Sequence, residues 1–337
     1  MSNPVLVEVT RGGVVESRHR GSVVVVDADG RDVLALGNVR APVFPRSAIK
    51  AFQALPLIES GAADRFGFGN AEIALACSSH NGEAAHVSTA RRMLKACGCD
   101  EGCLECGPQA PEREADKARL ARLQGRPARI HNNCSGKHSG FIATAMAMGV
   151  DPTGYSKRGH PVMDGVIDAV CDMVGDVFAE DYCGLDGCSI PTFAVPLTAT
   201  AYGFAKFATG AKLGPERTKA VARIREAVFA EPFMVAGTGR FCTRAMTILG
   251  KRAFVKTGAE GVFTVALPEQ GLGMAIKIDD GATRASEVVT AAVVSTFLKL
   301  GDGALDALIH PQVLTRLNEV AGEIRPAEAL VKALDAA

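Results

Sequence analysis

The sequence predicts an α/β fold of the α+β type, in which an antiparallel sheet built from both ends of the chain is flanked by helices. Three observations lead to this prediction. Runs rich in β-branched residues, closed by Gly or Asp-Gly, occur up to residue 37 and again from residue 252. The section between them shows the apolar spacing of helices, interrupted by Gly and Pro. No internal repeat, low-complexity tract or long charged linker divides the chain.

The predicted strands are short and lie near the two ends of the chain. The runs VLVEVTRGG, SVVVVDADG and DVLALG indicate antiparallel strands, because Gly and Asp-Gly favour the tight turns between them. The expected strands are 5–13, 22–30, 32–37, 252–257, 262–267 and 272–278. We therefore expect one sheet that combines N-terminal and C-terminal strands.

The predicted helices form a subregion over approximately residues 60–250 of a single domain, 1–337. An earlier helix is expected to begin at Ser47, after Pro45, and to end near Pro56, because Ile49 and Phe52 recur at helical spacing. The others are 83–97, 112–124, 137–148, 161–178, 196–209, 214–229 and 284–300, with a short helix after Pro326.

The composition narrows the classes of partner. Lys plus Arg and Asp plus Glu are equal at 37 each, so no net field attracts nucleic acid or an anionic membrane. The N-terminal residues show no basic segment followed by an apolar one, and no apolar run reaches the roughly 18 residues that span a bilayer. We expect a cytoplasmic protein, whose ten cysteines are reduced thiols or metal ligands more than a disulfide framework.

The stretch FPRSAIKAFQALP places a serine and a lysine one helical turn apart. Residues i and i+3 share a helix face, so Ser47 and Lys50 can come within hydrogen-bond reach. A lysine kept neutral by burial can remove the proton of a serine hydroxyl, and Ile49 and Phe52 make such burial plausible. A single SxxK also occurs by chance, so this pair needs support from other motifs.

Two further motifs supply that support. CSSHNG contains Ser79 and Asn81 as an SxN element, and FVKTGAEG contains Lys256 in a KTG element on a predicted strand. SxxK, SxN and KTG in this order are the signature set of the serine β-lactamases and penicillin-binding proteins. We expect Ser79 and Lys256 to face Ser47 and Lys50 in one cleft. Only 32 residues separate the two serines, which is shorter than expected for a penicillin-recognising enzyme.

A second pair of motifs contains cysteines that could bind a metal ion. HNNCSGKHSG supplies Cys134 and Lys137, and DGCSIP supplies Cys188. Two thiolates and a nitrogen suit zinc, and three protein ligands leave a fourth position open. Two buried cysteines without a metal are the plainer alternative. The denser cluster CGCDEGCLECG lacks the distant second ligand pair of a zinc ribbon and is more simply a thiol-rich loop; it contains Cys97, Cys99, Cys103 and Cys106.

Together these motifs resemble a known family. RSAIKAFQALP, CSSHNGE, LECG, HNNCSGKHSGF, GCSIPTF and KTGAEGVF are similar, in this order and over nearly the whole chain, to the Rhizobium etli type of L-asparaginase. The resemblance implies a fold similar to serine β-lactamases and serine-dependent glutaminases, a homodimer, and hydrolysis of L-asparagine to aspartate and ammonia. It implies two catalytic pairs, Ser47 with Lys50 and Ser79 with Lys256. It also implies zinc held by Cys134, Lys137 and Cys188.

In the expected mechanism Ser47 attacks the side-chain amide of asparagine, with Lys50 as base, and the activity rises toward alkaline pH. Zinc is expected to orient the substrate more than to activate water. The residues beside the motifs that could bind the amino-acid substrate are Arg46, Asn81, His138 and Asp186. Two alternatives remain: a glutaminase or β-lactamase-like amidohydrolase that uses the same serine, and a non-catalytic zinc protein.

Overall fold

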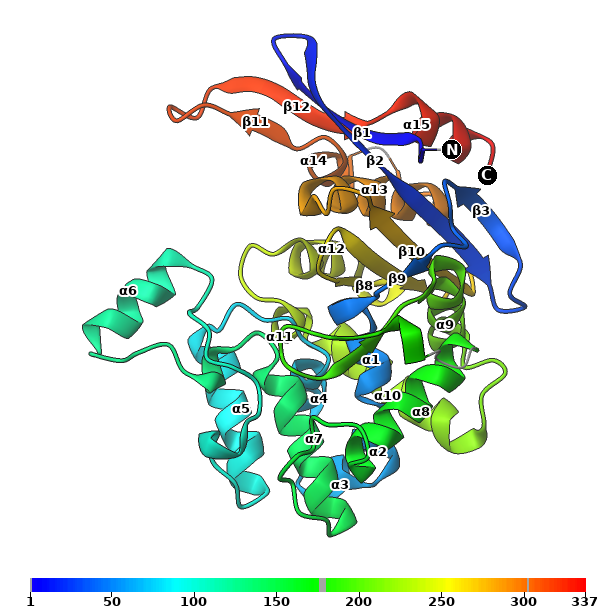
Figure 1. The fold of residues 1–337 in the computed structure, drawn as a ribbon. Coiled ribbons are helices and arrows are strands. Elements are labelled where there is room, and N and C mark those ends of the chain that lie inside the picture. Colours follow the sequence, from blue (N-terminus) through cyan, green and yellow to red (C-terminus); the bar gives the residue numbers. More distant parts are fainter. Residues whose placement is uncertain (1, 176–179, 302) are drawn as a thin grey trace.

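The computed structural model describes residues 2–175, 180–301 and 303–337. Its main sheet is antiparallel, with the order β11-β12-β1-β2-β10-β9-β8 and with β3 paired to β2 (Figure 1). The strands of this sheet are β1 (Val5–Arg11), β2 (Val14–Asp27), β3 (Asp32–Leu36), β8 (Phe254–Thr257), β9 (Val262–Leu267), β10 (Leu272–Ile278), β11 (Gln312–Leu314) and β12 (Val320–Pro326). Both ends of the chain therefore build one sheet, as predicted.

The long strand β2 joins the two halves of the sheet. Its first half pairs with β1, and its second half lies between β3 and β10. Side chains alternate between the faces of a strand. Val24 and Val26 pack with Leu197 and Ala201 of α9 (Leu197–Thr209), whereas Val23 and Val25 belong to the larger core cluster. Helix α13 (Thr283–Phe297) packs against β9 and β10, so the strands are buried on both sides.

Helices make up most of the middle of the chain and lie below the sheet in Figure 1. The aromatic rings of Phe52 and Phe204 lie 4.5 Å apart, and those of Phe207 and Phe254 lie 5.6 Å apart, which packs α1, α9 and β8 together. The remaining helices are α1 (Lys50–Gln53), α2 (Leu55–Glu59), α3 (Ala62–Arg65), α4 (Asn70–Ala76), α5 (Ala84–Ala96), α6 (Glu114–Arg122), α7 (Ser135–Met148), α8 (Pro161–Val174), α10 (Pro215–Ala230), α11 (Pro232–Val235), α12 (Phe241–Leu249), α14 (Asp306–Ile309) and α15 (Glu328–Asp335).

The structure confirms the predicted fold class and corrects several elements. The expected helix from Ser47 to Pro56 is a 3-10 turn, η1 (Arg46–Ile49), followed by α1 and α2. Pro56 lies in the first turn of α2, where its missing N–H costs no hydrogen bond, so it does not end the helix. The prediction missed several short elements, among them α3, α4, α11, α12, α14, β11 and β12, and it began the second strand at residue 22, whereas β2 begins at Val14. Residues 176–178 of the predicted helix 161–178 lie outside the described residues.

A membrane-spanning segment was not expected. Among the described residues, no helix is both long enough and apolar enough to cross a bilayer.

Candidate active site

Lys50 is the most highly connected of the predicted catalytic residues. It begins α1, directly after η1, and is completely buried. Its Nζ donates to the Ser78 carbonyl oxygen at 2.5 Å, to Ser79 Oγ at 3.0 Å and to Cys134 Sγ at 3.0 Å. A lysine ammonium has three donors, so these contacts use all of them. Lys50 thus links the serine motif to the cysteine motif.

Ser79 lies between two lysines. Lys256, on β8, donates from Nζ to Ser79 Oγ at 2.9 Å and to the Thr257 carbonyl oxygen at 2.8 Å. The two lysines therefore meet at one hydroxyl, although Lys50 and Lys256 are more than 200 residues apart in the chain. Strand β9 fixes η1 beside them, because Thr264 Oγ1 donates to the Ala48 carbonyl oxygen at 3.2 Å. This three-residue contact of Lys50, Ser79 and Lys256 is named the Ser79 cluster below.

The electrostatics of the cluster favour one neutral lysine. Burial, together with the positive charge of Lys50, lowers the pKa of Lys256 to about 7. Two ammonium groups at one hydroxyl repel each other, so the second proton binds weakly. Lys256 is consequently suited to accept a proton near neutral pH.

This pKa predicts the pH dependence of activity. If neutral Lys256 is the proton acceptor, kcat/KM rises about tenfold per pH unit up to about pH 7 and levels off above it.

The lowered pKa of Lys256 also affects the stability of the fold. Between pH 7 and 10.5, the ordinary pKa of a lysine, the unfolded chain binds a proton at Lys256 that the folded chain lacks, so the free energy of unfolding rises with pH in this window. Steady-state rates and urea titrations at several pH values, compared with Lys256→Met, measure both. A kcat/KM that is flat from pH 5 to 8 would contradict the prediction.

Ser47 does not join this cluster by a direct contact. It lies half-buried in η1, and among the described residues its hydroxyl makes no hydrogen bond. The expected Ser47–Lys50 hydrogen bond is thus not formed, because the Lys50 donors are directed to Ser78, Ser79 and Cys134. Catalytic hydrogen bonds often tighten only in the complex with the substrate. The nucleophilic role of Ser47 stays a prediction.

The three predicted zinc ligands come together. Cys134 precedes α7, Lys137 lies in the first turn of α7, and Cys188 lies in the loop between β5 (Cys183–Leu185) and β6 (Pro191–Phe193). Lys137 Nζ donates to Cys188 Sγ at 3.1 Å, and the Cys134 thiol hydrogen-bonds to Cys188. All three side chains are buried, and both cysteines are free thiols.

The protonation of these groups suits a soft cation. The hydrogen bond from Cys134 and the charge of Lys137 lower the pKa of Cys188 to about 5, against the effect of burial. The same hydrogen bond, with burial, raises the pKa of Cys134 to about 12. Burial alone would lower the pKa of Lys137, but Cys134, Cys188 and Asp186 outweigh it and raise that pKa, so Lys137 is an ammonium group. A thiolate, a thiol and an ammonium group joined through Cys188 form a donor set for zinc only once the thiol and the ammonium lose their protons. No group of three His, Cys, Asp or Glu able to hold a metal occurs among the described residues; the predicted set contains only two such residues, both cysteines, because its third member is a lysine.

Three of the four predicted substrate-binding residues surround this region. Arg46 Nε donates to Asp186 Oδ1 at 2.8 Å. Burial alone would raise the pKa of Asp186, but Lys137 and Arg46 outweigh it and lower that pKa. His138 is buried, and burial lowers its pKa to about 3, so its ring is neutral.

His138 has one ring nitrogen free for a ligand. Its Nδ1 lies 2.7 Å from the Tyr155 hydroxyl. The oxygen of that hydroxyl accepts a hydrogen bond from the Glu105 backbone N–H at 2.8 Å. The Tyr155 proton needs an acceptor, so Nδ1 accepts it and Nε2 carries the proton of the neutral ring. Among the described residues, that buried Nε2 has no hydrogen-bond partner. It is a donor available to a carbonyl or a carboxylate.

The fourth residue, Asn81, hydrogen-bonds mainly to protein groups. Its Nδ2 donates to Glu83 Oε1 at 3.1 Å and to the Thr238 carbonyl oxygen at 3.2 Å, and its Oδ1 accepts from Arg240 at 3.0 Å. Glu83, Arg240 and Tyr155 were not predicted as site residues. Glu83 lies two residues after Asn81, and this closeness could have indicated it. Arg240 and Tyr155 come from distant segments of the chain, so no local signal marks them.

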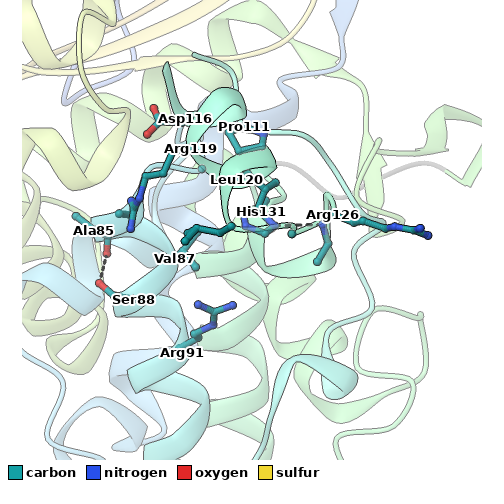
Figure 2. A pocket seen from close by; sticks show the side chains of 15 residues that line it. Ala85, Val87, Ser88, Arg91, Pro111, Asp116, Arg119, Leu120, Arg126 and His131 are labelled. Carbon is teal, nitrogen blue, oxygen red and sulfur yellow. Dashed lines mark hydrogen bonds between the residues drawn. The ribbon is translucent and has the colours of Figure 1, made fainter. Parts of the chain in front are cut away.

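Burial raises the pKa of Cys106 to about 12, with the nearby Cys134 and Cys188 contributing, so one member of the dense cysteine cluster lies close to the predicted zinc site. Cys97, Cys99, Cys103 and Cys106 are free thiols. A cavity of about 590 Å³ lies between α5 and α6 (Figure 2). It is lined by His131, Arg119 and Gly82 among others, and contains none of the predicted catalytic residues.

The candidate site and a comparison with known families together indicate the class of protein. In this α/β protein two lysines contact one buried serine hydroxyl, an arrangement in which a neutral lysine could accept a proton. The model of the L-asparaginase II family matches residues 7–326, and the chain belongs to that family. It is therefore an amidohydrolase of the asparaginase type.

Two further comparisons add little. A solved structure from Bacteroides dorei DSM 17855, described as a "putative beta-lactamase", is 13% identical, with 77% of this chain and 84% of that chain covered at a TM-score of 0.39. A similarity of this size supports no inference about activity. No curated protein matches the chain.

Proposed function

We propose that the protein is an L-asparaginase that hydrolyses L-asparagine to L-aspartate and ammonia through a serine and two lysines. The single observation that supports this most is the contact of Lys50 and Lys256 with one hydroxyl, that of Ser79. Membership of the L-asparaginase II family supplies the substrate class. One expectation from the sequence is modified here: the lowered pKa of Lys256 supports Lys256, in place of Lys50, as the proton acceptor.

In the proposed reaction Ser47 Oγ attacks the side-chain amide carbon of asparagine. Ser47 is half-exposed and can meet a substrate, whereas Ser79 is buried. The Ser47 proton passes through Ser79 to Lys256. The C–N bond then breaks, that proton goes to the leaving nitrogen, and ammonia leaves a β-aspartyl ester on Ser47. Water, deprotonated by the same route, attacks the ester and releases aspartate.

Three residues are proposed to bind the amino-acid groups of asparagine. Asp186, a carboxylate, would accept from the α-ammonium, and Arg46 would hold the α-carboxylate. The unpartnered Nε2–H of His138 would donate to a substrate oxygen. The half-buried Arg46–Asp186 pair arranges its two charges as a zwitterionic amino acid requires.

Zinc is proposed to be held by Cys134, Lys137 and Cys188. Their mutual contacts and their nitrogen and sulfur donors fit this metal. A bound zinc would act as a Lewis acid toward a substrate oxygen and would fix its orientation. The chain's own part is to keep these ligands buried and, through the Lys50–Cys134 contact at 3.0 Å, joined to the Ser79 cluster.

Metal analysis tests the zinc proposal without reference to activity. We expect one zinc per chain in the wild type and an affinity at least about 100-fold lower in Cys188→Ala, measured by competition with a chromophoric chelator. Cys103→Ser serves as the control, since Cys103 is a free, half-buried thiol of the dense cysteine cluster. Equal stoichiometric zinc in wild type and Cys188→Ala would rule out the assignment.

A small amide panel tests the proposed function. Ammonia release is measured from L-asparagine and L-glutamine, and hydrolysis is measured with a chromogenic β-lactam. The proposal expects asparagine to be the best substrate. A clear preference for glutamine or the β-lactam would favour the serine amidohydrolase alternatives, and no turnover of any of them would favour a non-catalytic zinc protein.

A homodimer in the cytoplasm is also proposed. The β1–β2 and β11–β12 hairpins extend from the same end of the sheet (Figure 1). They carry exposed apolar side chains, Val14 at 70%, Leu314 at 50%, Leu317 at 81% and Val320 at 61%. An apolar surface of this kind supports association with a second copy. Light scattering should give twice the chain mass, and Leu317→Glu should reduce the measured mass toward that of one chain.

The ten free thiols fit a reducing compartment such as the cytoplasm, which localisation of a tagged chain would test.

A further inference from the structure

The segment that carries Ser79 is held in place by neighbouring segments on two sides. The Ser79 N–H donates to the Val235 carbonyl oxygen at 3.0 Å, and the Asn81 N–H donates to the Ala236 carbonyl oxygen at 3.0 Å. On the other side, the Glu112 N–H donates to the Asn81 carbonyl oxygen at 2.9 Å. Ser79 can remain between its two lysines only if these segments keep their positions.

One buried carboxylate joins all of these segments. Glu83 is only 6% exposed, and its oxygens accept four hydrogen bonds. Oε1 accepts from Asn81 Nδ2 at 3.1 Å and from the Thr238 N–H at 2.7 Å. Oε2 accepts from Thr238 Oγ1 at 2.8 Å and from Arg113 at 2.6 Å. Burial alone would raise the pKa of Glu83, but these bonds lower it and keep the group ionised.

Asn81 connects Glu83 to the segment that carries Ser79. Both of its amide N–H groups are used, by Glu83 and by the Thr238 carbonyl, so neither is left for a substrate. Its Oδ1 accepts from Arg240 Nη1 at 3.0 Å, and the same Nη1 lies 3.5 Å from the Ser79 carbonyl oxygen. The side chain of Asn81 is thus more suited to hold the Ser79 segment than to bind asparagine.

The turn that carries Thr238 and Arg240 is built for close approach. Gly237 has a φ of +118°, and a Cβ there would lie 2.6 Å from Glu83 Oε1 and 2.7 Å from Asn81 Nδ2. Only glycine allows both the backbone conformation and the contact.

We infer that Glu83 is a positioning residue for the reaction: through Asn81, Thr238 and Arg240 it holds Ser79 between Lys50 and Lys256. The inference rests on the proposed serine–lysine mechanism. The Glu83 carboxylate bonds to Asn81, Thr238 and Arg113 and to none of the proposed reacting groups, so we expect it to act on the rate of the chemical steps and not on substrate affinity.

Substitution of Glu83 tests the inference. Glu83→Gln keeps the shape but places an amide NH₂ against donors, so Ser79 shifts; kcat falls about 100-fold while KM stays within about threefold. The number of sites that bind L-aspartate in calorimetry stays near one per chain, whereas a merely structural role would reduce it. Glu59→Gln is the matched control, since it replaces a carboxylate that is 21% exposed and accepts two hydrogen bonds, here from Arg217, outside the segments that hold Ser79; its kcat stays within about threefold.

A second pair of variants decides the matter if Glu83→Gln does not fold. Arg240→Gln should lower kcat and move the acid limb of the pH profile upward, because the charge of Arg240 lowers the pKa of Lys256. Arg240→Lys keeps a cationic donor and should retain most of the wild-type kcat and most of the wild-type pH profile. A loss of folding alone would not move this limb. The groups that face Lys256 and stay unchanged are Lys50 on α1, Cys77 and Ser79 after α4, Cys134 before α7, and Cys242 on α12.

The outcomes separate this inference from the proposed function. If the wild type releases no ammonia from asparagine, the proposed function fails and the inference falls with it. If the wild type is active and Glu83→Gln keeps kcat within about threefold, the inference alone is wrong. It is also wrong if Glu83→Gln does not fold and both Arg240 variants behave like wild type.

Discussion

Ser47→Ala is expected to lower ammonia release from asparagine by about 10⁴-fold or more while the protein stays folded. Ser47 supplies the proposed nucleophile, since it is half-exposed and directly follows Arg46 of the Arg46–Asp186 pair. A short incubation with substrate followed by intact-mass and peptide mass spectrometry should show a β-aspartyl ester at Ser47 in the wild type and none in the variant.

Two comparisons make this prediction specific. Ser60→Ala changes a half-buried serine at the end of α2 and should leave kcat unchanged. Ser79→Ala should slow the reaction about 100-fold, since it interrupts the proton path but leaves the nucleophile. If Ser47→Ala remains active and the ester maps to Ser79, the two serines exchange roles, and the buried cluster itself carries the nucleophile.

Lys50→Met is expected to lower kcat about 10³-fold. Methionine fills a similar volume, but the Ser79 hydroxyl loses one of its two lysine partners, and the Ser78 carbonyl and Cys134 lose theirs. The remaining activity should show its acid limb at a higher pH than wild type, because the positive charge of Lys50 lowers the pKa of Lys256. Steady-state kinetics from pH 5 to 10 measure both effects.

A matched control exists for the cost of removing a buried lysine. Lys206 on α9 is 5% exposed, and its Nζ donates to the Asp172 carbonyl oxygen at 2.7 Å. Lys206→Met should cost comparable stability with little change in kcat. If Lys50→Met loses stability but keeps its rate, Lys50 only supports the fold, and the catalytic assignment of the pair is wrong.

The sequence predicted most of the fold where a period was clear. The strands at 262–267 and 272–278 match β9 and β10 at both ends, because continuous apolar runs between turn residues specify buried strands. It failed at Pro56 and at β11 and β12. A proline fits a helix start as well as a helix end, and these two exposed strands are stabilised by pairing, β12 with β1 and β11 with β12, more than by their own pattern.

The sequence by itself determined which residue types carry the chemistry and their order in the chain: SxxK, SxN and KTG, with a separate pair of cysteine motifs. Only the tertiary structure decided how they meet. It brings Lys50, Ser79 and Lys256 to one hydroxyl, leaves Ser47 without a partner among the described residues, and surrounds Asn81 with Glu83 and Arg240. The physical reason is that hydrogen bonds and pKa shifts depend on distance and burial. Packing between remote segments sets both, and local sequence does not encode them.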